Sequence, residues 1–354
     1  MVMGRREAMR AMAAGTLLAP ELLRGGAQAA DQLYDRAIVI DSLSIERWDE
    51  AGFAAAKQSG YTAIHTSLAN RNLEVALRDL EEWQKCFAEH PDKLIRATKA
   101  ADIRRAKQEG RLAVVLGFQN ATCMESDLRN LDRLHEKGAR CIQLTYNARN
   151  LLGDGCTERT NCGLSDFGAA AVEHMNDLGI LVDLSHCGEA TSRDGIALSK
   201  KPPAFTHTMC KALHDHVRAK SDDLLRAMAE KGGVTAIVTL GYFVGPEGAT
   251  VEDYLRHVDH AVKVCGIEHV GLATDYQIRG IEASATRETW YLPRLRSFKP
   301  SYRVRWPPWI PELDKPDRFR VVARGLEQRG YRSSDIEKLL GLNWLRLFAD
   351  VFSG

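Results

Sequence analysis

Two histidines have the residue type and the position that a metal site requires. His186 ends the run "LVDLSH" and His207 ends the run "PAFTH". Imidazole is the commonest protein ligand of metal ions. Neighbouring strands lie about 4.8 Å apart, so two such rings can share one zinc ion at about 2.0–2.1 Å each. A lone histidine at a strand end is usually structural, but this pair together with Asp275 favours a metal site.

The elements that must position these residues follow an alternating pattern. Beyond residue 35, short apolar runs alternate with amphipathic stretches that have apolar residues at three- and four-residue spacing. This pattern predicts strands followed by helices, and therefore a parallel sheet with helices outside. Eight runs favour a single-domain (β/α)8 barrel of the TIM type, an α/β fold, over an open doubly wound sheet. The runs are residues 36–42, 61–68, 112–118, 140–146, 179–185, 203–207, 233–240 and 269–275.

The carboxyl ends of the strands are where such barrels build their active sites. Polar residues at these ends are therefore the candidates for chemistry. They are Asp41 (first run), His65 (second), Gln119 and Asn120 (third), Tyr146 and Asn147 (fourth), His186 (fifth), His207 (sixth) and Asp275 (eighth).

The composition is that of an ordinary globular protein. The 354 residues are 45% hydrophobic and 27% charged, with a net charge of +1. This balance gives no electrostatic reason to expect nucleic acid or an anionic membrane as the main partner. No apolar run approaches 18 residues, so no transmembrane segment is expected.

The first 30 residues have the layout of an export signal. Arg5 and Arg6 precede a weak apolar stretch that ends in Ala27-Gln28-Ala29. Paired arginines and a small-residue cleavage site indicate twin-arginine export, with a frayed amphipathic helix as the alternative. We therefore expect residues 31–354 to form the barrel of a periplasmic or exported protein, which would be cytoplasmic if the signal is not used.

The eight cysteines follow neither a small-domain disulfide framework nor paired zinc spacing. Cys156 and Cys162 flank a polar loop and could pair in an oxidising compartment. The sequence leaves this pairing open.

Several motifs together resemble one family. They are "LVDLSH", "FTHT", "DHVRAKSDDLLRAMAEKGG", "HVGLATD", "LTYNARNLLGDG" and "GLNWLRLF". In this order they resemble the membrane (renal-type) dipeptidases of the amidohydrolase superfamily, from about residue 36 to 349, with an insertion at about 280–311. The resemblance implies a metal-dependent barrel hydrolase that cleaves dipeptides with two bridged zinc ions, and a homodimer is a reasonable expectation.

The resemblance also implies roles for individual residues. His186 and His207 match the ligands of one zinc ion. Arg218 matches the arginine that grips the substrate carboxylate, and Asp275 matches the aspartate that handles protons at the scissile amide.

The departures from the family pattern concern the other zinc ion. Leu43 and Ile45 replace the first-strand His-x-Asp ligands, Gln119 replaces the bridging glutamate, and Tyr146 replaces a histidine. An unbalanced buried pair of divalent ions would cost many kcal/mol, so we expect one ion and reject two. Its ligands would be His186 and His207, with the carbonyl oxygen of Gln119 or the ring of His65 as further candidates.

These residues predict hydrolysis of an amide bond with one zinc ion. Asp275 would act as general base and then acid, and Arg218 would hold a carboxylate through a bidentate fork. Tyr146 would stabilise the developing oxyanion, and Asn147 would contact the substrate. Two alternatives remain: an enzyme acting on another carboxylated substrate, a lactone or an N-acyl compound, with one metal ion or none, and an inactive periplasmic binding protein.

The insertion carries the segment "WYLPRLRSFKPSYRVRWPPW" at residues 290–309. Because it follows the eighth run, it should lie over the barrel mouth. It could be a lid that grips an anionic or aromatic substrate, or a contact between subunits.

Overall fold

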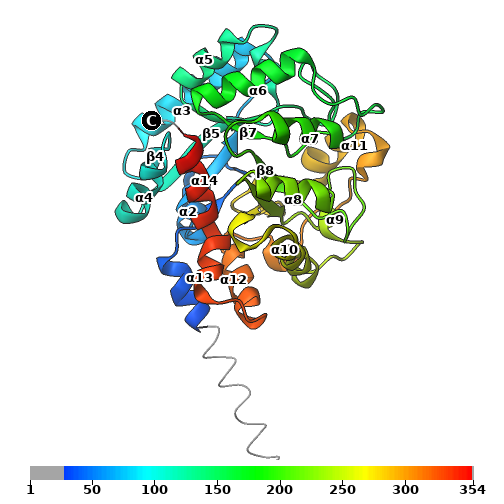
Figure 1. Cartoon of the computed structure of the whole chain (residues 1–354). Helices are drawn as coiled ribbons and strands as arrows, with labels where there is room; N and C mark the ends of the chain where they lie inside the picture. The colour runs from blue at the N-terminus through cyan, green and yellow to red at the C-terminus, as the bar shows by residue number, and fades with distance from the viewer. Residues whose placement is uncertain (1–27, 353–354) are drawn as a thin grey trace, which may run out of the picture.

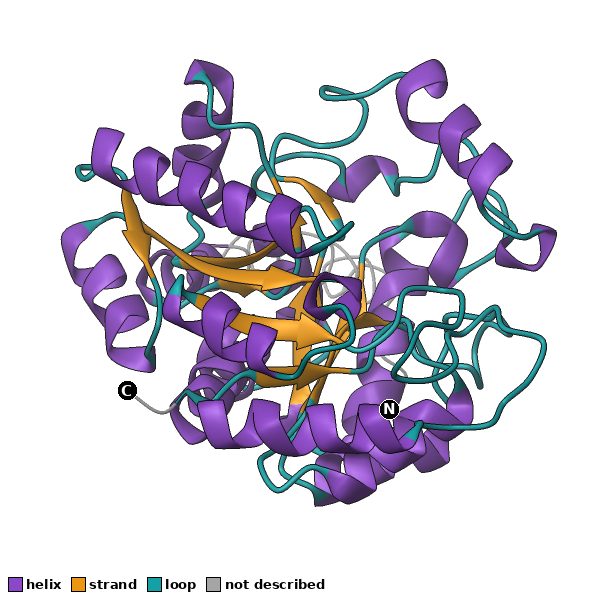
Figure 2. Ribbon diagram, turned by 90° about the horizontal axis from the view of Figure 1, so that it is seen from above, coloured by secondary structure: helices purple, strands orange, loops and turns teal. Residues whose placement is uncertain are grey.

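The eight apolar runs form the eight strands of a closed barrel in the computed structural model, which describes residues 28–352. All neighbouring strands are parallel, in the order β1-β3-β5-β6-β7-β8-β9-β10. Figure 2 shows them at the centre of a layer of helices. The predicted (β/α)8 fold is confirmed. The strands are β1 (Ile40–Asp41), β3 (Ala63–Ser67), β5 (Leu112–Phe118), β6 (Ala139–Gln143), β7 (Leu181–Asp183), β8 (Ala204–Thr208), β9 (Val234–Val238) and β10 (Val270–Ala273).

The barrel closes where the first strand meets the last. The Ser42 amide donates to the carbonyl oxygen of Leu272 at 3.3 Å, and the Ser42 hydroxyl donates to the same oxygen at 2.9 Å. Asp41 accepts from Thr274, through its amide at 3.0 Å and its hydroxyl at 2.7 Å. Asp41 therefore fixes the strand ends, which is a structural role for this strand-end candidate.

Three short strands were not predicted. β4 (Leu94–Arg96) pairs with the first half of β5, and β2 (Ser44–Ile45) pairs with β11 (Tyr276–Gln277) beside the mouth. Runs of two or three residues are too short to show a period in the sequence.

The helices surround the barrel (Figure 1), and several begin and end at residues suited to the position. Ser165 caps α6 by accepting from the Gly168 amide at 3.0 Å, and Gly179 ends it with a left-handed φ of 76°. The helices after successive strands are α2 (Glu50–Ser59), α3 (Leu73–Glu89), α4 (Ala100–Glu109), α5 (Arg129–Glu136), α6 (Asp166–Leu178), α7 (Glu189–Leu198), α8 (Asp222–Glu230), α9 (Gly241–Val244), α10 (Val251–Cys265), α12 (Arg318–Gln328), α13 (Ser333–Glu337) and α14 (Asn343–Val351).

A helix at residues 28–36 precedes the barrel and packs on it. Ala30 is buried, and Asp31 pairs with Arg324 of α12 at 2.7 Å. Residues 28–30, the last three of the predicted export signal, belong to this helix. The paired arginines of that signal lie outside the described residues.

The insertion crosses the carboxyl ends of the strands. It contains a π-helical turn (Arg287–Tyr291), α11 (Leu292–Ser297) and a turn at Pro300–Tyr302. Lys299 donates to the carbonyl oxygen of Thr157 at 2.8 Å, and the Phe298 and Tyr146 ring centroids are 6.2 Å apart. The segment therefore lies over the mouth, as expected.

Asp41→Asn is expected to flatten the pH dependence of stability. Burial raises the pKa of Asp41 from 3.8 to about 7, so the folded chain binds this proton more tightly than the unfolded chain. The free energy of unfolding then falls as pH rises through about 7, by roughly 4 kcal/mol for three pKa units. Urea unfolding at pH 4.5 and pH 8 should show a smaller difference in the variant, and the exposed Asp177→Asn serves as control. Equal slopes in wild type and Asp41→Asn would contradict this prediction.

Candidate active site

The two strand-end histidines lie side by side in the barrel mouth. His186 follows β7, and His207 is the fourth residue of β8. β7 and β8 are parallel neighbours, so their carboxyl ends meet at one edge. Both side chains are buried, and their Nε2 atoms are 2.9 Å apart. The structure therefore brings these two predicted residues together.

The other ring nitrogen of each histidine fixes its tautomer. His186 Nδ1 is 2.7 Å from Asn147 Oδ1, and an amide oxygen only accepts, so the ring donates. His207 Nδ1 is 2.8 Å from Thr206 Oγ1. The Thr206 proton goes to Asp183 Oδ2 at 2.6 Å, so this ring donates as well. Each neutral imidazole then carries its lone pair on Nε2.

Two lone pairs that face each other at 2.9 Å repel each other unless a cation lies between them. Burial, with the positive charge of Arg218, holds the pKa of His186 and His207 well below 6.5, so a proton is disfavoured. A divalent metal ion binds neutral imidazole, and 2.9 Å is less than twice the zinc–nitrogen distance of about 2.0–2.1 Å. The pair therefore fits a single metal ion.

Further protein ligands are few. Within residues 28–352, no group of three His, Cys, Asp or Glu side chains could hold a metal ion. Gln119, after β5, donates through its side-chain Nε2 to Asp275 Oδ1 at 3.4 Å. The side-chain carbonyl oxygen of Gln119 therefore remains a candidate metal ligand. His65 donates through Nδ1 to the carbonyl oxygen of Ser42 at 2.9 Å. Its Nε2 is buried against Gly117 without a hydrogen-bond partner.

Leu43 and Ile45 offer no metal-binding atom. Leu43 is buried beside the site, where its carbonyl oxygen accepts from the Asp275 amide at 2.8 Å. Ile45 is 37% exposed and pairs with Gln277 in the small sheet. The first-strand positions therefore cannot supply ligands for a second ion.

Asp275 faces the site from the end of β10. Its φ of 67° is left-handed, a conformation that Asp tolerates better than most residues. Burial raises its pKa to about 6, against the opposing effect of Arg218 and Arg294. A carboxyl group with this pKa can accept a proton near neutral pH and return it.

Arg218 is fully buried in the segment after β8. Its Nη2 donates to the carbonyl oxygen of His207 at 2.9 Å, and Nη1 donates to that of Ser185. Its Nε is buried without a partner, and no carboxylate of the described chain forms an ion pair with it. This residue is therefore a buried cation whose Nε is free to donate.

Tyr146 and Asn147 follow β6 and contact His186. The Tyr146 ring stacks on the imidazole at 4.1 Å with an interplanar angle of 20°. Burial raises the pKa of Tyr146 to about 12, so its hydroxyl stays protonated and can donate. Asn147 has a φ of 61°, and its Nδ2 is buried without a partner.

Two buried residues of the site were missed by the sequence analysis. Asp183 accepts from the hydroxyls of Ser185 and Thr206, both at 2.6 Å, and so orients His207. The aspartate in "LVDLSH" was a visible signal for it. Lys220 donates to the carbonyl oxygens of Leu184 and Cys187, and burial lowers its pKa to about 8. No pattern in the sequence marks Lys220 as buried.

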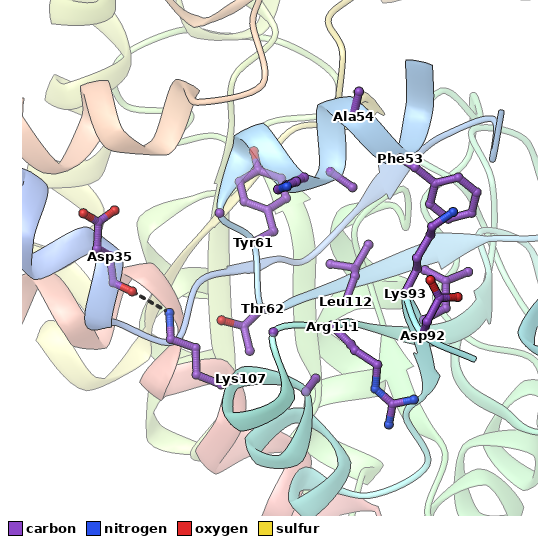
Figure 3. A pocket seen from close by; sticks show the side chains of 16 residues that line it. Asp35, Phe53, Ala54, Tyr61, Thr62, Asp92, Lys93, Lys107, Arg111 and Leu112 are labelled. Carbon is purple, nitrogen blue, oxygen red and sulfur yellow. Dashed lines mark hydrogen bonds between the residues drawn. The ribbon is translucent and has the colours of Figure 1, made fainter. Parts of the chain in front are cut away.

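A separate cavity lies at the opposite end of the barrel. It has a volume of about 660 Å³ and is lined by residues at the amino-terminal ends of strands, such as Thr62 before β3 and Leu112 at the start of β5 (Figure 3). Lys107 lies at its edge and donates to the carbonyl oxygen of Asp35 at 2.9 Å. Barrel enzymes work at the carboxyl ends of the strands, so the candidate site is at the histidine end.

Two further expectations can be compared with the described residues. Cys156 and Cys162 are both free thiols in the structure. Within residues 28–352, no helix has the length and apolarity needed to cross a membrane.

Comparisons with known proteins agree with this arrangement. An amidohydrolase of known structure from Pseudomonas aeruginosa is 28% identical, has a TM-score of 0.83, and aligns over 91% of this chain and 99% of its own. Dipeptidase verJ of Clonostachys rogersoniana is 25% identical over 344 residues, which cover 94% of this chain and 82% of that protein. A metallopeptidase from Rhodobacter sphaeroides, 19% identical with a TM-score of 0.74 over 89% and 99% of the two chains, shares the fold.

The fold and the histidine pair define a barrel hydrolase of the amidohydrolase type. The profile of the membrane dipeptidase family, peptidase family M19, matches residues 39–288, and the chain belongs to this family. Dipeptidases of this family are metal-dependent. The predicted family and enzyme class are thereby confirmed.

Proposed function

We propose that this chain hydrolyses an amide bond in a small carboxylated substrate, such as a dipeptide, with one zinc ion held by His186 and His207. The observation that carries the proposal is the pair of Nε2 lone pairs facing each other at 2.9 Å, with both Nδ1 atoms donating. A bound zinc ion supplies Lewis acidity at the scissile carbonyl and lowers the pKa of a coordinated water.

The chain's own residues supply proton transfer and binding. Asp275 takes a proton from the attacking water and delivers it to the leaving nitrogen, which its pKa of about 6 permits near neutral pH. The Tyr146 hydroxyl donates to the oxyanion that forms at the carbonyl. Arg218 has an unpaired Nε and no carboxylate partner, and it binds the substrate carboxylate. Asn147 keeps His186 in the correct tautomer and presents a free Nδ2 to the substrate.

The charges of the site support one ion and not two. Arg218 and Lys220 are already buried cations, and neither contacts a carboxylate in the part of the chain that the structure describes. A second divalent ion would need the anionic ligands that Leu43, Ile45 and Gln119 do not provide. One ion, balanced by the substrate carboxylate and Asp275, avoids that cost.

Metal analysis combined with a substrate panel tests this function. The purified full-length chain should retain about one zinc per chain and release amino acids from dipeptides when zinc is present. Cleavage of N-acyl compounds or lactones but not dipeptides would assign a different substrate. A chain that holds no zinc and cleaves none of them would overturn the proposal.

A further inference from the structure

One face of the insertion is turned toward the barrel mouth. Trp290 and Arg294 lie on the helical segment Arg287–Ser297, and Phe298 is the extended residue that follows it. Trp290 packs against Tyr242 of α9, with ring centroids 6.3 Å apart. Phe298 packs against Tyr146 after β6 at 6.2 Å. The insertion therefore contacts α9 through Trp290 and the segment after β6 through Phe298.

Arg294 lies between these two anchors in the chain, and its positive charge acts on Tyr146 after β6 and on Tyr242 of α9. Its guanidinium lies 4.0 Å from the Trp290 ring centroid, and Nη1 donates to the Trp290 carbonyl oxygen at 2.9 Å. Its charge lowers the pKa of Asp275 against the effect of burial. The positive charge of Arg294 therefore acts on Asp275, the residue proposed to transfer protons.

No carboxylate within residues 28–352 forms an ion pair with Arg294. Other arginines of the chain do have such partners: Arg324 pairs with Asp31 and Arg329 pairs with Asp259, each at 2.7 Å. Instead, Arg294 is held over an aromatic ring by its own helical turn. This arrangement keeps it ordered with its remaining donors available.

The mouth has more positive than negative side chains. Arg218, Lys220 and Arg294 contribute three cations, of which Arg218 and Arg294 lower the pKa of the Asp275 carboxyl group and Lys220 acts on His186. Asp183 is satisfied by Ser185 and Thr206 and offers little to a substrate. A single substrate carboxylate on Arg218 leaves Arg294 without an anionic partner among residues 28–352, and a second carboxylate would supply one.

We propose that Arg294 binds a second carboxylate, so that the substrate is an amide-linked dicarboxylate such as a dipeptide with a carboxyl-terminal Asp or Glu. This inference rests on the proposed function, with Arg218 taking the α-carboxylate. Arg294 then takes the side-chain carboxylate and acts as a specificity residue supplied by the insertion.

Matched substrates test the proposal. Wild type should cleave Ala-Glu with a kcat/KM at least about 30-fold above that for Ala-Gln, tested with both stereoisomers of the second residue. Arg294→Gln should reduce this ratio below about 3, and Arg294→Lys should restore part of it. The matched control is Arg296→Gln, which changes an exposed arginine of the same helix. An unchanged ratio in Arg294→Gln, or no preference in wild type, overturns the proposal while leaving amide hydrolysis intact.

A binding measurement separates this inference from the proposed function. Calorimetric titration of the full chain with glutarate and with butyrate should show that glutarate binds more tightly. The Arg294→Gln substitution should abolish this difference in affinity. This result without cleavage of any amide would support the dicarboxylate site and refute the hydrolase. Equal binding of the two acids would refute the dicarboxylate site. Thermal unfolding of Arg294→Gln should match that of Arg296→Gln, which shows that both variants fold.

Discussion

His186→Ala is expected to lower kcat/KM by about 10³-fold and to reduce bound zinc from about one per chain to less than a tenth. His186 and His207 are the two imidazoles whose lone pairs face each other. Either ring alone would supply only one ligand atom to the zinc ion. Loss of the ion removes several kcal/mol of electrostatic stabilisation from the transition state. Each 1.36 kcal/mol lost lowers the rate about tenfold. Metal content by mass spectrometry and amino acid release from a dipeptide measure both effects.

The matched control for this prediction is His260→Ala. His260 is half-buried on α10 and bonds to Asp222 at 2.8 Å, away from the barrel mouth. Its loss should change neither zinc content nor activity. Full activity of His186→Ala after exhaustive chelation would show that catalysis does not use this pair.

The fold could be predicted from the sequence because a parallel strand in a barrel is buried on both faces. β5 is buried at every residue, and its seven residues coincide with the predicted run. β1 has only two paired residues, although the predicted run covered seven, since its first residues lead in from the preceding helix. The number and order of strands were thus visible, whereas the extent of pairing was not.

The sequence predicted which residues form the site, but not their hydrogen bonds or their orientation. His186, His207 and Asp275 were visible because strand ends must meet at one edge of a parallel barrel. The tautomers were not, because they depend on contacts from Asn147 and Thr206 that no spacing rule encodes. The position of Arg294 was also hidden, because it depends on how a long insertion packs over several loops.

The residues that close the barrel are not those at the first-strand positions Leu43 and Ile45. The join between the first and last strands depends on Asp41, Ser42 and Thr274, which bond to each other's strands. Leu43 is buried beside the site without contributing a side-chain hydrogen bond. Function in this fold can therefore change at strand ends while the scaffold persists.

Arg218→Met is expected to lower kcat/KM for a carboxylated substrate by about 10²–10³-fold, because removing one partner of a buried charged contact costs roughly 2–5 kcal/mol. The same change leaves the carbonyl oxygens of Ser185 and His207 without their donor, so the melting temperature should also fall. Arg218→Lys keeps the charge but lacks the planar fork, and it should recover only a small part of the activity.

Arg218 could act by binding the substrate carboxylate or by supporting the backbone beside the two histidines. A substrate whose carboxylate is replaced by an amide distinguishes these two roles. If Arg218 binds the carboxylate, wild type should prefer the acid by about 10²-fold or more, and Arg218→Met should cleave both substrates at similar, low rates. If Arg218 only supports Ser185 and His207, the variant should lose zinc and slow both substrates by the same factor. Because the Nε of Arg218 is buried without a hydrogen-bond partner within residues 28–352, we expect the first result.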